Sequence, residues 1–281
     1  MKEKLNDFGK RILGILSRND MLILPGQLAF FLLLAVVPTI TLIIYFASIF
    51  NVSIDFLTNF LTRSFGSEVA KLIIPIINDI NLNPSLLVPL FVALYAASGG
   101  ASSIIVTSNQ LYGIENTTFL HRKIKGLMMT LILIILVVFL LLIPVFGDKL
   151  IELIRFVNLN DTITKGLTFI IHLSKTPISW LLIFFLIKVI YTMAPDDLIP
   201  SNCTTKGSIF TTLGLVISTS IYSSYVNNMA HYDVLYGGLS HFVVLMIWFY
   251  IISYIITIGI AINHDDVKIW QNKEKQKNYI K

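Results

Sequence analysis

The sequence predicts an all-α membrane protein, a polytopic bundle of six transmembrane helices accompanied by short amphipathic helices at the membrane interface. Of the 281 residues, 55% are hydrophobic and only 13% are charged, and this charged share is about half that of a soluble domain. The mean hydropathy is +0.79. The apolar residues also gather in stretches long enough to cross a hydrocarbon core, which takes roughly 20 helical residues.

The six predicted spans are residues 22–50, 86–112, 127–146, 177–194, 207–226 and 239–263. The third span is the most uniformly apolar, so we expect it to face lipid. The fifth span is rich in serine and threonine, whose hydroxyl groups bond within a helix or across to a neighbour. We therefore expect the fifth span to be buried in the bundle.

The positive charges beside the spans predict the orientation. Residues 1–21 form an amphipathic N-terminal segment with five Lys or Arg residues, and residues 264–281 form a basic tail with another five. With the loops on the same side the number is fourteen, against six on the other side. Cytoplasmic segments carry the excess of positive charge, so both termini are predicted to be cytoplasmic.

Amphipathic helices are predicted in the outer connections, over residues 52–65, 69–80 and 149–173, and in the N-terminal segment. Apolar residues recur there at helical spacing. We do not expect these segments to span the bilayer, so we place them at the interface or over the end of the bundle. The N-terminal helix has two interpretations, an anchor on anionic lipid or a helix that binds a partner.

The second span holds a glycine pair among serines. Gly99 and Gly100 lie mid-membrane between Ser98 and Ser102, and Asn109 lies near the predicted cytoplasmic end. Paired glycines let another backbone approach closely, or let a helix break beside a cavity. Close helix packing is one interpretation, and a flexible helix that lines a substrate pathway is the other.

Two further residues are unusual inside a span. Pro38 is a candidate helix break, because proline removes a backbone hydrogen bond. Lys188 is the formally charged residue well inside a span, where a charge costs about 2.5–3.5 kcal/mol. Its amine either reaches back to the cytoplasmic interface or faces a water-filled cavity or an anionic headgroup.

Polar and aromatic residues crowd the last third of the chain. Tyrosines around the outer end of the fifth span are typical of an aromatic belt. His231 and Asp233 follow it, and a proton-linked site is a second interpretation of that pair. The predicted substrate pathway comprises Ser98, Gly99, Gly100, Ser102, Asn109, Lys188, Tyr191, Ser218, Tyr222, Tyr225, Tyr236 and Trp248.

The last third also resembles a known family. The stretch YSSYVNNMAHYDVLYGGLSHFVVLMIWFYIISYIITIGIAIN is similar to the signature of the YihY/BrkB family of bacterial inner-membrane proteins. LAFFLLLAVVPTITL and AASGGASSIIVTSNQLYGIE resemble that family's first and second spans. The resemblance implies a multi-pass protein of the bacterial inner (plasma) membrane. The matching residues are Ala29, Pro38, Asn109, Tyr112, Gly113, Tyr191, Pro195, Tyr225, Tyr232, Tyr236, Gly237, Trp248, Tyr250, Gly259 and Asn263.

Three positions depart from the pattern of the family. Thr192 and Gly99 stand where an arginine is frequent, and Ala261 stands where a glutamate is frequent. If those charges carry function, this chain works differently or relies on Lys188. If they form a structural ion pair, the loss of both partners costs little, because removal of a whole buried pair can be neutral.

No catalytic apparatus is predicted. The family was once labelled ribonuclease BN, but metal-dependent nucleases need clustered ligands, and the five histidines here are scattered. We therefore expect no enzyme activity, no metal, no cofactor and no nucleic-acid partner. The aspartates at the cytoplasmic ends of the spans are predicted only to solvate helix ends; they are Asp196, Asp197, Asp265 and Asp266.

The leading functional hypothesis is a transporter or flippase-like protein that moves a lipid or amphipathic substrate. Membrane lipids are the predicted partners, while a second copy of the chain or an envelope protein stays open. The alternative is a non-catalytic scaffold protein of the cell envelope. An intramembrane hydrolase is a third interpretation, but it needs a nucleophile and base, or a metal set, that the sequence does not offer.

Overall fold

The computed structural model describes residues 12–17, 19–49, 54–65, 87–156, 161–228 and 239–280. These residues are helical almost throughout, and no strand occurs among them, which confirms the all-α fold class. The elements in chain order are α2 (Asp20–Ile49), α3 (Ile54–Phe65), α5 (Leu87–Tyr112), α6 (Phe119–Phe156), α7 (Asp161–Met193), the 3-10 helix η2 (Ser201–Thr204), α8 (Thr205–Asn228) and α10 (Leu239–Ile280).

Six of the described helices are long and apolar enough to cross a membrane, as the sequence predicts. The apolar segments are Asp20–Ala47, Val88–Tyr112, Phe119–Ile143, Ile163–Met193, Ser201–Val226 and Phe242–Asn272. The chain is therefore a polytopic helix bundle.

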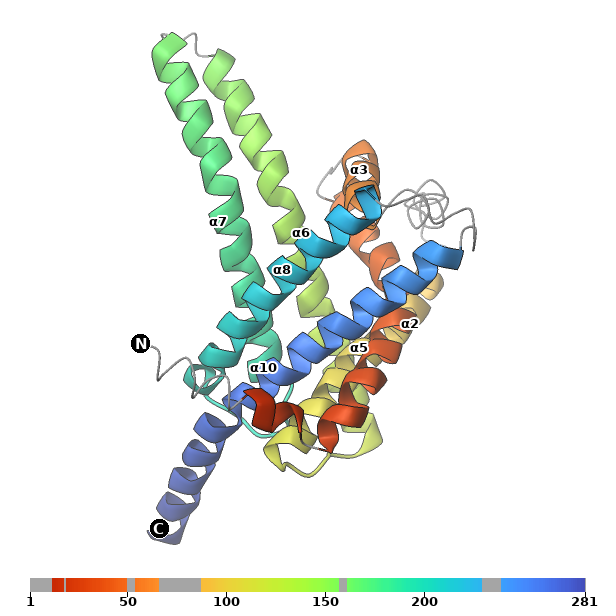
Figure 1. The fold of residues 1–281 in the computed structure, drawn as a ribbon, viewed down its shortest axis with the longest axis vertical. Helices are drawn as coiled ribbons and strands as arrows, with labels where there is room; N and C mark the ends of the chain where they lie inside the picture. Colours follow the sequence, from red (N-terminus) through yellow and green to blue (C-terminus); the bar gives the residue numbers. More distant parts are fainter. Residues whose placement is uncertain are drawn as a thin grey trace.

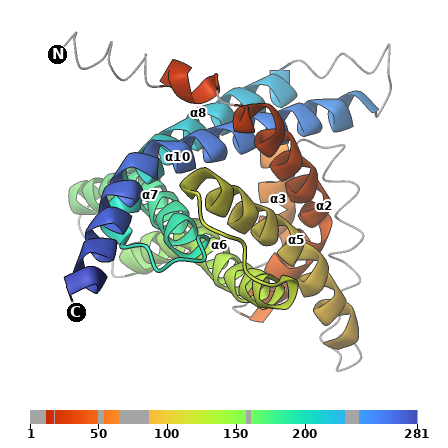
Figure 2. The same cartoon turned by 90° about the horizontal axis from the view of Figure 1, so that it is seen from below.

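Helix α5 lies in the middle of the bundle, in contact with α2, α6 and α10 (Figures 1 and 2). Helix α8 runs along α10 and also contacts α7. We call the end where α2 begins, α5 ends, α6 begins and α7 ends the basal end; it lies at the bottom of Figure 1. This is the end that the positive charges predict to be cytoplasmic.

The prediction of a separate interfacial helix over residues 149–173 is wrong. Residues 149–156 continue α6 and residues 161–173 begin α7, so the two helices form one long hairpin that extends beyond its neighbours (Figure 1). With 38 residues, α6 is about 57 Å long at about 1.5 Å per residue. A hydrocarbon core is about 30 Å thick, so the tip of the hairpin has to leave it.

Two other expectations, about a helix break and a helix end, need correction. Pro38 does not break its helix, because α2 runs unbroken from Asp20 to Ile49 through both Pro25 and Pro38. Helix α10 does not end at Asn263 but continues as an α-helix to Ile280. The segment predicted as a basic tail is thus helical along most of its length.

The predictions that the third span (α6) faces lipid and that the fifth span (α8) is buried are also wrong. In the most apolar window of each span, 39% of the residues of α6 are buried but only 17% of those of α8. Helix α6 is covered because it contacts α5, α7 and α2. Several hydroxyl groups of α8 bond to carbonyls of their own helix, as those of Thr212, Ser218 and Ser220 do, so a buried neighbour is not required for them.

Two apolar clusters fill the bundle. The basal one joins α2, α5, α7 and α10 through residues such as Leu28, Ile105, Tyr191 and Ile260. The other lies toward the opposite end, where Leu57 of the amphipathic helix α3 is buried with residues of α2, α6 and α10. The amphipathic helix predicted over residues 52–65 is confirmed by α3, whereas the one predicted over residues 69–80 lies outside the described residues.

Candidate functional site

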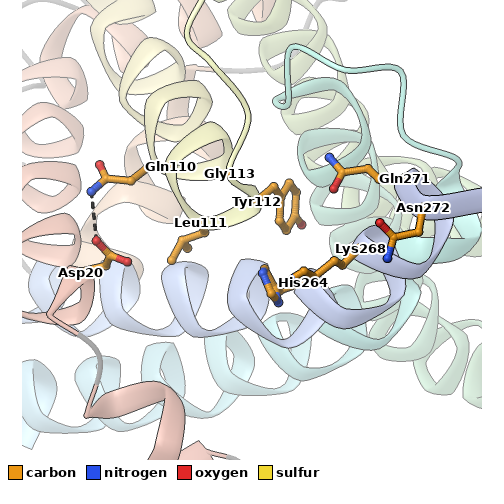
Figure 3. Close-up of a pocket in the computed structure, with 9 residues that line it drawn as sticks. All are labelled: Asp20, Gln110, Leu111, Tyr112, Gly113, His264, Lys268, Gln271 and Asn272. Atoms are coloured by element: carbon orange, nitrogen blue, oxygen red, sulfur yellow. Dashed lines mark hydrogen bonds between the residues drawn. The ribbon is translucent and has the colours of Figure 1, made fainter. Parts of the chain in front are cut away.

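An open pocket of about 420 Å³ lies at the basal end, between the start of α2, the end of α5 and the last third of α10 (Figure 3). Most of its lining side chains are polar. The lining residues are Asp20, Gln110, Leu111, Tyr112, Gly113, His264, Lys268, Gln271 and Asn272.

Helix α5 has to stop at this pocket, because Gly113 adopts a left-handed backbone with φ of 66°. Glycine tolerates that conformation and commonly follows the last residue of a helix. The amide of Ile114 then donates to the Asn109 carbonyl at 2.9 Å. The turn leaves the side chains of Gln110 and Tyr112 at the pocket.

The α2 side of the pocket is held by one side-chain hydrogen bond. Gln110 Nε2 donates to Asp20 Oδ1 at 3.0 Å (Figure 3). Asp20 lies in the first turn of α2, where a carboxylate is favoured by the helix dipole. The start of α2 is also tied to α10, since the Tyr254 hydroxyl donates to the Met21 carbonyl at 3.1 Å.

The α10 side supplies His264, Lys268, Gln271 and Asn272, all beyond the predicted end of the sixth span. His264 Nδ1 lies 3.2 Å from Asp265 Oδ1. Because α10 stays helical past Asn263, these residues form a wall of the pocket.

Also at the basal end, just after α7, Asp196 joins three separate parts of the chain. Its carboxylate accepts hydrogen bonds from Lys125 Nζ at 2.8 Å, from Asn109 Nδ2 at 2.8 Å and from the backbone and hydroxyl of Thr117 at 3.1 and 3.0 Å. The Asp196 amide in turn donates to Asn109 Oδ1 at 2.9 Å. We call Asp196, Lys125, Asn109 and Thr117 the Asp196 network.

The Asp196 side chain is only 3% exposed, so the expectation that it merely solvates a helix end is wrong. Burial by itself raises the pKa of a carboxyl group. The hydrogen bonds from Lys125, Thr117 and Asn109 outweigh burial and lower the pKa of Asp196 from 3.8 to about 2. The network therefore holds a carboxylate where the α7–α8 loop meets α5 and α6.

Helices α8 and α10 cross at two glycines. A methyl group added at Gly259 would overlap the hydroxyl groups of Thr211 and Tyr191, and one added at Gly207 would overlap the Gly259 carbonyl. The Tyr191 hydroxyl lies 2.6 Å from Thr211 Oγ1 and donates to the Ile256 carbonyl at 2.8 Å. The two backbones approach closely because neither residue has a side chain there.

A second close crossing joins α5 and α6. A methyl group added at Gly126 would meet Ser102 Oγ at 2.5 Å. On the α2 side of α5, a methyl group at Gly100 would be tight against Ala35 and Leu32, at 3.3 Å from each, whereas one at Gly99 would make an ordinary contact of 3.8 Å. Helix α5 is unbroken at the glycine pair, so Gly100 fits the packing interpretation.

The predicted pathway residues that the structure describes do not gather at one site, and none of these lines the pocket. Tyr222 and Trp248 stack with ring centroids 4.8 Å apart, in the cluster away from the basal end. Tyr225 is exposed, and the Ser218 hydroxyl bonds back to the Leu215 carbonyl at 3.3 Å. The Ser98 hydroxyl likewise bonds to its own helix, at the Tyr95 carbonyl.

The remaining candidates are single positions. The Lys188 amine lies 5.8 Å from the centre of the Phe184 ring and its residue is half-buried. Tyr236 lies outside the described residues, as do His231 and Asp233.

Two of the departures from the family pattern have plain structural surroundings. The hydroxyl of Thr192 lies 3.0 Å from that of Thr204, and Ala261 is buried in the basal cluster. Among the described residues, no three His, Cys, Asp or Glu side chains gather as a metal site.

Residues singled out by the resemblance thus recur in the architecture of the basal end. Asn109 belongs to the Asp196 network, Gly113 ends α5, and Tyr191 and Gly259 meet at the helix crossing. The profile of the family described as "Virulence factor BrkB" matches residues 12–278. The chain belongs to the BrkB family.

One relative of this BrkB-family chain is a protein of Bacillus subtilis (strain 168) named YfkH and described as ribonuclease-like. It is 27% identical over 243 residues, which are 85% of this chain and 87% of the relative. No solved structure matches the chain.

Sequence reasoning missed the pocket and the centre of the Asp196 network. One usable signal was Asp20 directly before an apolar run, which is typical of a helix start. Another was the run of His264, Lys268 and Gln271 at helical spacing after the sixth span, which predicts one continuing helix face. The partner of Asp196 has no signal of this kind, because Lys125 is distant in the sequence.

Proposed function

We propose that the chain is a transporter or flippase-like protein that moves a lipid or amphipathic substrate across the bilayer. The observation that supports this function best is a set of buried hydroxyl groups on the central helix α5. They have no hydrogen-bond partner among the described residues, and they belong to Ser102, Ser103, Thr107 and Ser108.

These hydroxyl groups differ from others in the bundle. The hydroxyl of Thr130 bonds to the Gly126 carbonyl at 2.7 Å, and that of Thr257 bonds to the Ser253 carbonyl at 2.7 Å. A buried polar group without a partner is unfavourable, all the more where no bulk water is near. Water or the polar part of a substrate would satisfy the α5 groups.

The hydroxyl groups of α5 that lack a partner among the described residues continue a row of polar residues that starts at the basal pocket. Thr107 and Ser108 are one turn before Gln110, Leu111 and Tyr112, which line the basal pocket. Polar groups therefore continue from the pocket into the bundle along α5. A headgroup that travels along α5 would exchange hydrogen bonds with them while its chains stay in lipid.

The test is lipid translocation in proteoliposomes that contain the purified chain. A fluorescent phospholipid is bleached from outside by an impermeant reductant, and we expect bleaching beyond the outer-leaflet fraction. Thr107→Val should slow this bleaching several-fold, whereas Thr130→Val, a matched buried threonine whose hydroxyl has a partner, should not. Bleaching that stops at the outer leaflet in folded wild-type protein would count against uncoupled lipid movement.

The scaffold function is supported by a different observation. Few residues of helix α7 are buried: within its most apolar window the share is 6%. Apolar side chains near the projecting tip, such as Ile163, Phe169 and Ile170, are more than half exposed. A scaffold would use this hairpin to bind an envelope protein, and deletion of the tip would then abolish partner capture without altering lipid movement.

The name of the relative raises ribonuclease activity as a rival. We expect no cleavage of labelled transfer RNA by the purified chain with Mg²⁺, Mn²⁺ or Zn²⁺, because the five histidines are scattered in the sequence. A mock purification from cells without the gene is the control. Cleavage that follows the protein through size exclusion and is absent from the mock sample would establish an enzyme.

A further inference from the structure

The basal pocket has opposite charges at its two ends. Figure 3 shows Asp20 at the α2 end and Lys268 farther along, on α10, with Leu111 and Tyr112 of α5 between them. Neither charge belongs to the Asp196 network.

The Asp20 end is suited to an ammonium group. Among the described residues Asp20 accepts one side-chain hydrogen bond, from Gln110 Nε2, and a carboxylate has about four acceptor sites. Since Gln110 donates through its nitrogen, its carbonyl oxygen is free to accept from a ligand. Three N–H groups of an ammonium can share these acceptors.

The Lys268 end is suited to a phosphate or another anion. Within the described part of the chain Lys268 has no ion-pair partner, whereas the nearby Lys206 is paired with Asp266 at 2.9 Å. His264 and Asn272 line the same end, and both can donate hydrogen bonds. A charged donor and neutral donors together favour an anion.

We propose that this pocket binds a small zwitterion, with a primary ammonium group at Asp20 and a phosphate group at Lys268. A volume of about 420 Å³ suits a small ligand. The pocket lies where the first apolar segment begins, at Asp20, and the second one ends, at Tyr112. The aminoalkyl phosphate is therefore either the headgroup of a phosphatidylethanolamine or the same group free in water.

This binding does not require that lipid is moved, so the proposal and the transport function can fail separately. The first arm measures binding of glycerophosphoethanolamine to the detergent-purified full chain by calorimetry. We expect it to bind roughly tenfold more tightly than glycerol phosphate or ethanolamine, each of which reaches one end only. This comparison uses wild-type protein and needs no variant.

The second arm assigns the ends. Lys268→Gln should weaken glycerophosphoethanolamine binding and leave ethanolamine binding unchanged. Asp20→Asn should also weaken glycerophosphoethanolamine binding but leave glycerol phosphate binding unchanged. Lys206→Gln, which removes a lysine outside the pocket, should change neither. Equal binding of all ligands by folded wild-type protein, or equal loss in Lys206→Gln, would overturn the proposal.

The third arm separates the two sources. The chain is placed in nanodiscs of phosphatidylglycerol with or without phosphatidylethanolamine, and retained lipid is counted by native mass spectrometry. Retention of phosphatidylethanolamine that Lys268→Gln abolishes identifies the headgroup of a lipid. Calorimetric binding without lipid retention identifies a free zwitterion. The absence of both calorimetric binding and lipid retention would overturn the proposal.

Discussion

The carboxylate of Asp196 is the best connected charged group in the described part of the bundle. It receives hydrogen bonds from α5, from the α5–α6 loop and from α6 at once. Removal of one partner of a buried, hydrogen-bonded charge is costly because the other partner is left without compensation. Asp196 is therefore expected to matter more for the fold than its place in a loop suggests.

Asp196→Asn should destabilise the protein by about 1.5–3 kcal/mol, the range for hydrogen bonds to charged groups. The amide that replaces the carboxylate cannot accept from Lys125 and Asn109 together. Thermal unfolding followed by size exclusion in detergent measures the change. The matched control is Asp197→Asn at the exposed neighbouring position, and equal stability of the two variants would contradict the role of the network.

The Asp196 network also predicts an acid limit to stability. The pKa of Asp196 in the folded state, about 2, is below the ordinary value of 3.8. A lowered pKa contributes stability above the ordinary value, and that contribution, roughly 2 kcal/mol, disappears as the pH falls through the folded value. Unfolding midpoints should fall between about pH 4 and pH 2, and this fall should be smaller in Asp196→Asn.

At the scale of elements, the close crossings decide how the helices meet. Helices α8 and α10 can approach only because Gly207 and Gly259 face each other, and the Tyr191 hydroxyl then reaches a carbonyl of α10. At the basal end the Gly207–Gly259 crossing therefore gives a close backbone contact between α8 and α10. The long α6–α7 hairpin instead projects beyond the other described helices (Figure 1).

Gly259→Ala should destabilise the bundle, because the new methyl group would overlap two buried hydroxyl groups, which would have to move and give up their hydrogen bonds. Overpacking of this kind costs about 1–3 kcal/mol. Gly99→Ala is the matched control in another span, since its methyl group would have ordinary contacts. If both variants unfold at the wild-type temperature, the crossing is looser than described.

At the scale of the whole molecule, the basal end gathers the pocket, the Asp196 network and the α8–α10 crossing. The positive charges of the sequence predict that this end faces the cytoplasm. The orientation decides from which side a ligand reaches the pocket, and it can be tested because Cys203 is the single cysteine of the chain.

In a Cys203→Ser background, a cysteine at Lys165 should react with a membrane-impermeant maleimide in intact cells. A cysteine at Asn272 should react only after permeabilisation, because α7 begins at the end opposite the pocket. Labelling is read by gel shift, with fully permeabilised cells as the reference. Labelling of the Asn272 position in intact cells would reverse the proposed orientation.

The fold class follows from the sequence because it depends on local, one-dimensional properties. Six apolar stretches of sufficient length require six helices in a bilayer, whatever their neighbours are. The family can be identified from the sequence for the same reason, because its motifs are contiguous stretches of the chain. The predicted positions of the helix ends are less accurate where an apolar segment and a polar segment form one continuous helix, as in α6, α7 and α10.

The sites depend on which distant residues the fold brings together. Asp20, Gln110 and Lys268 come from three different helices, and Asp196 of the α7–α8 loop meets Lys125 of α6. The burial of α6 and the exposure of α8 reverse what their compositions suggest, because burial depends on neighbours and not on the apolar content of a helix. Such pairings follow from helix packing, and no spacing along the chain encodes them.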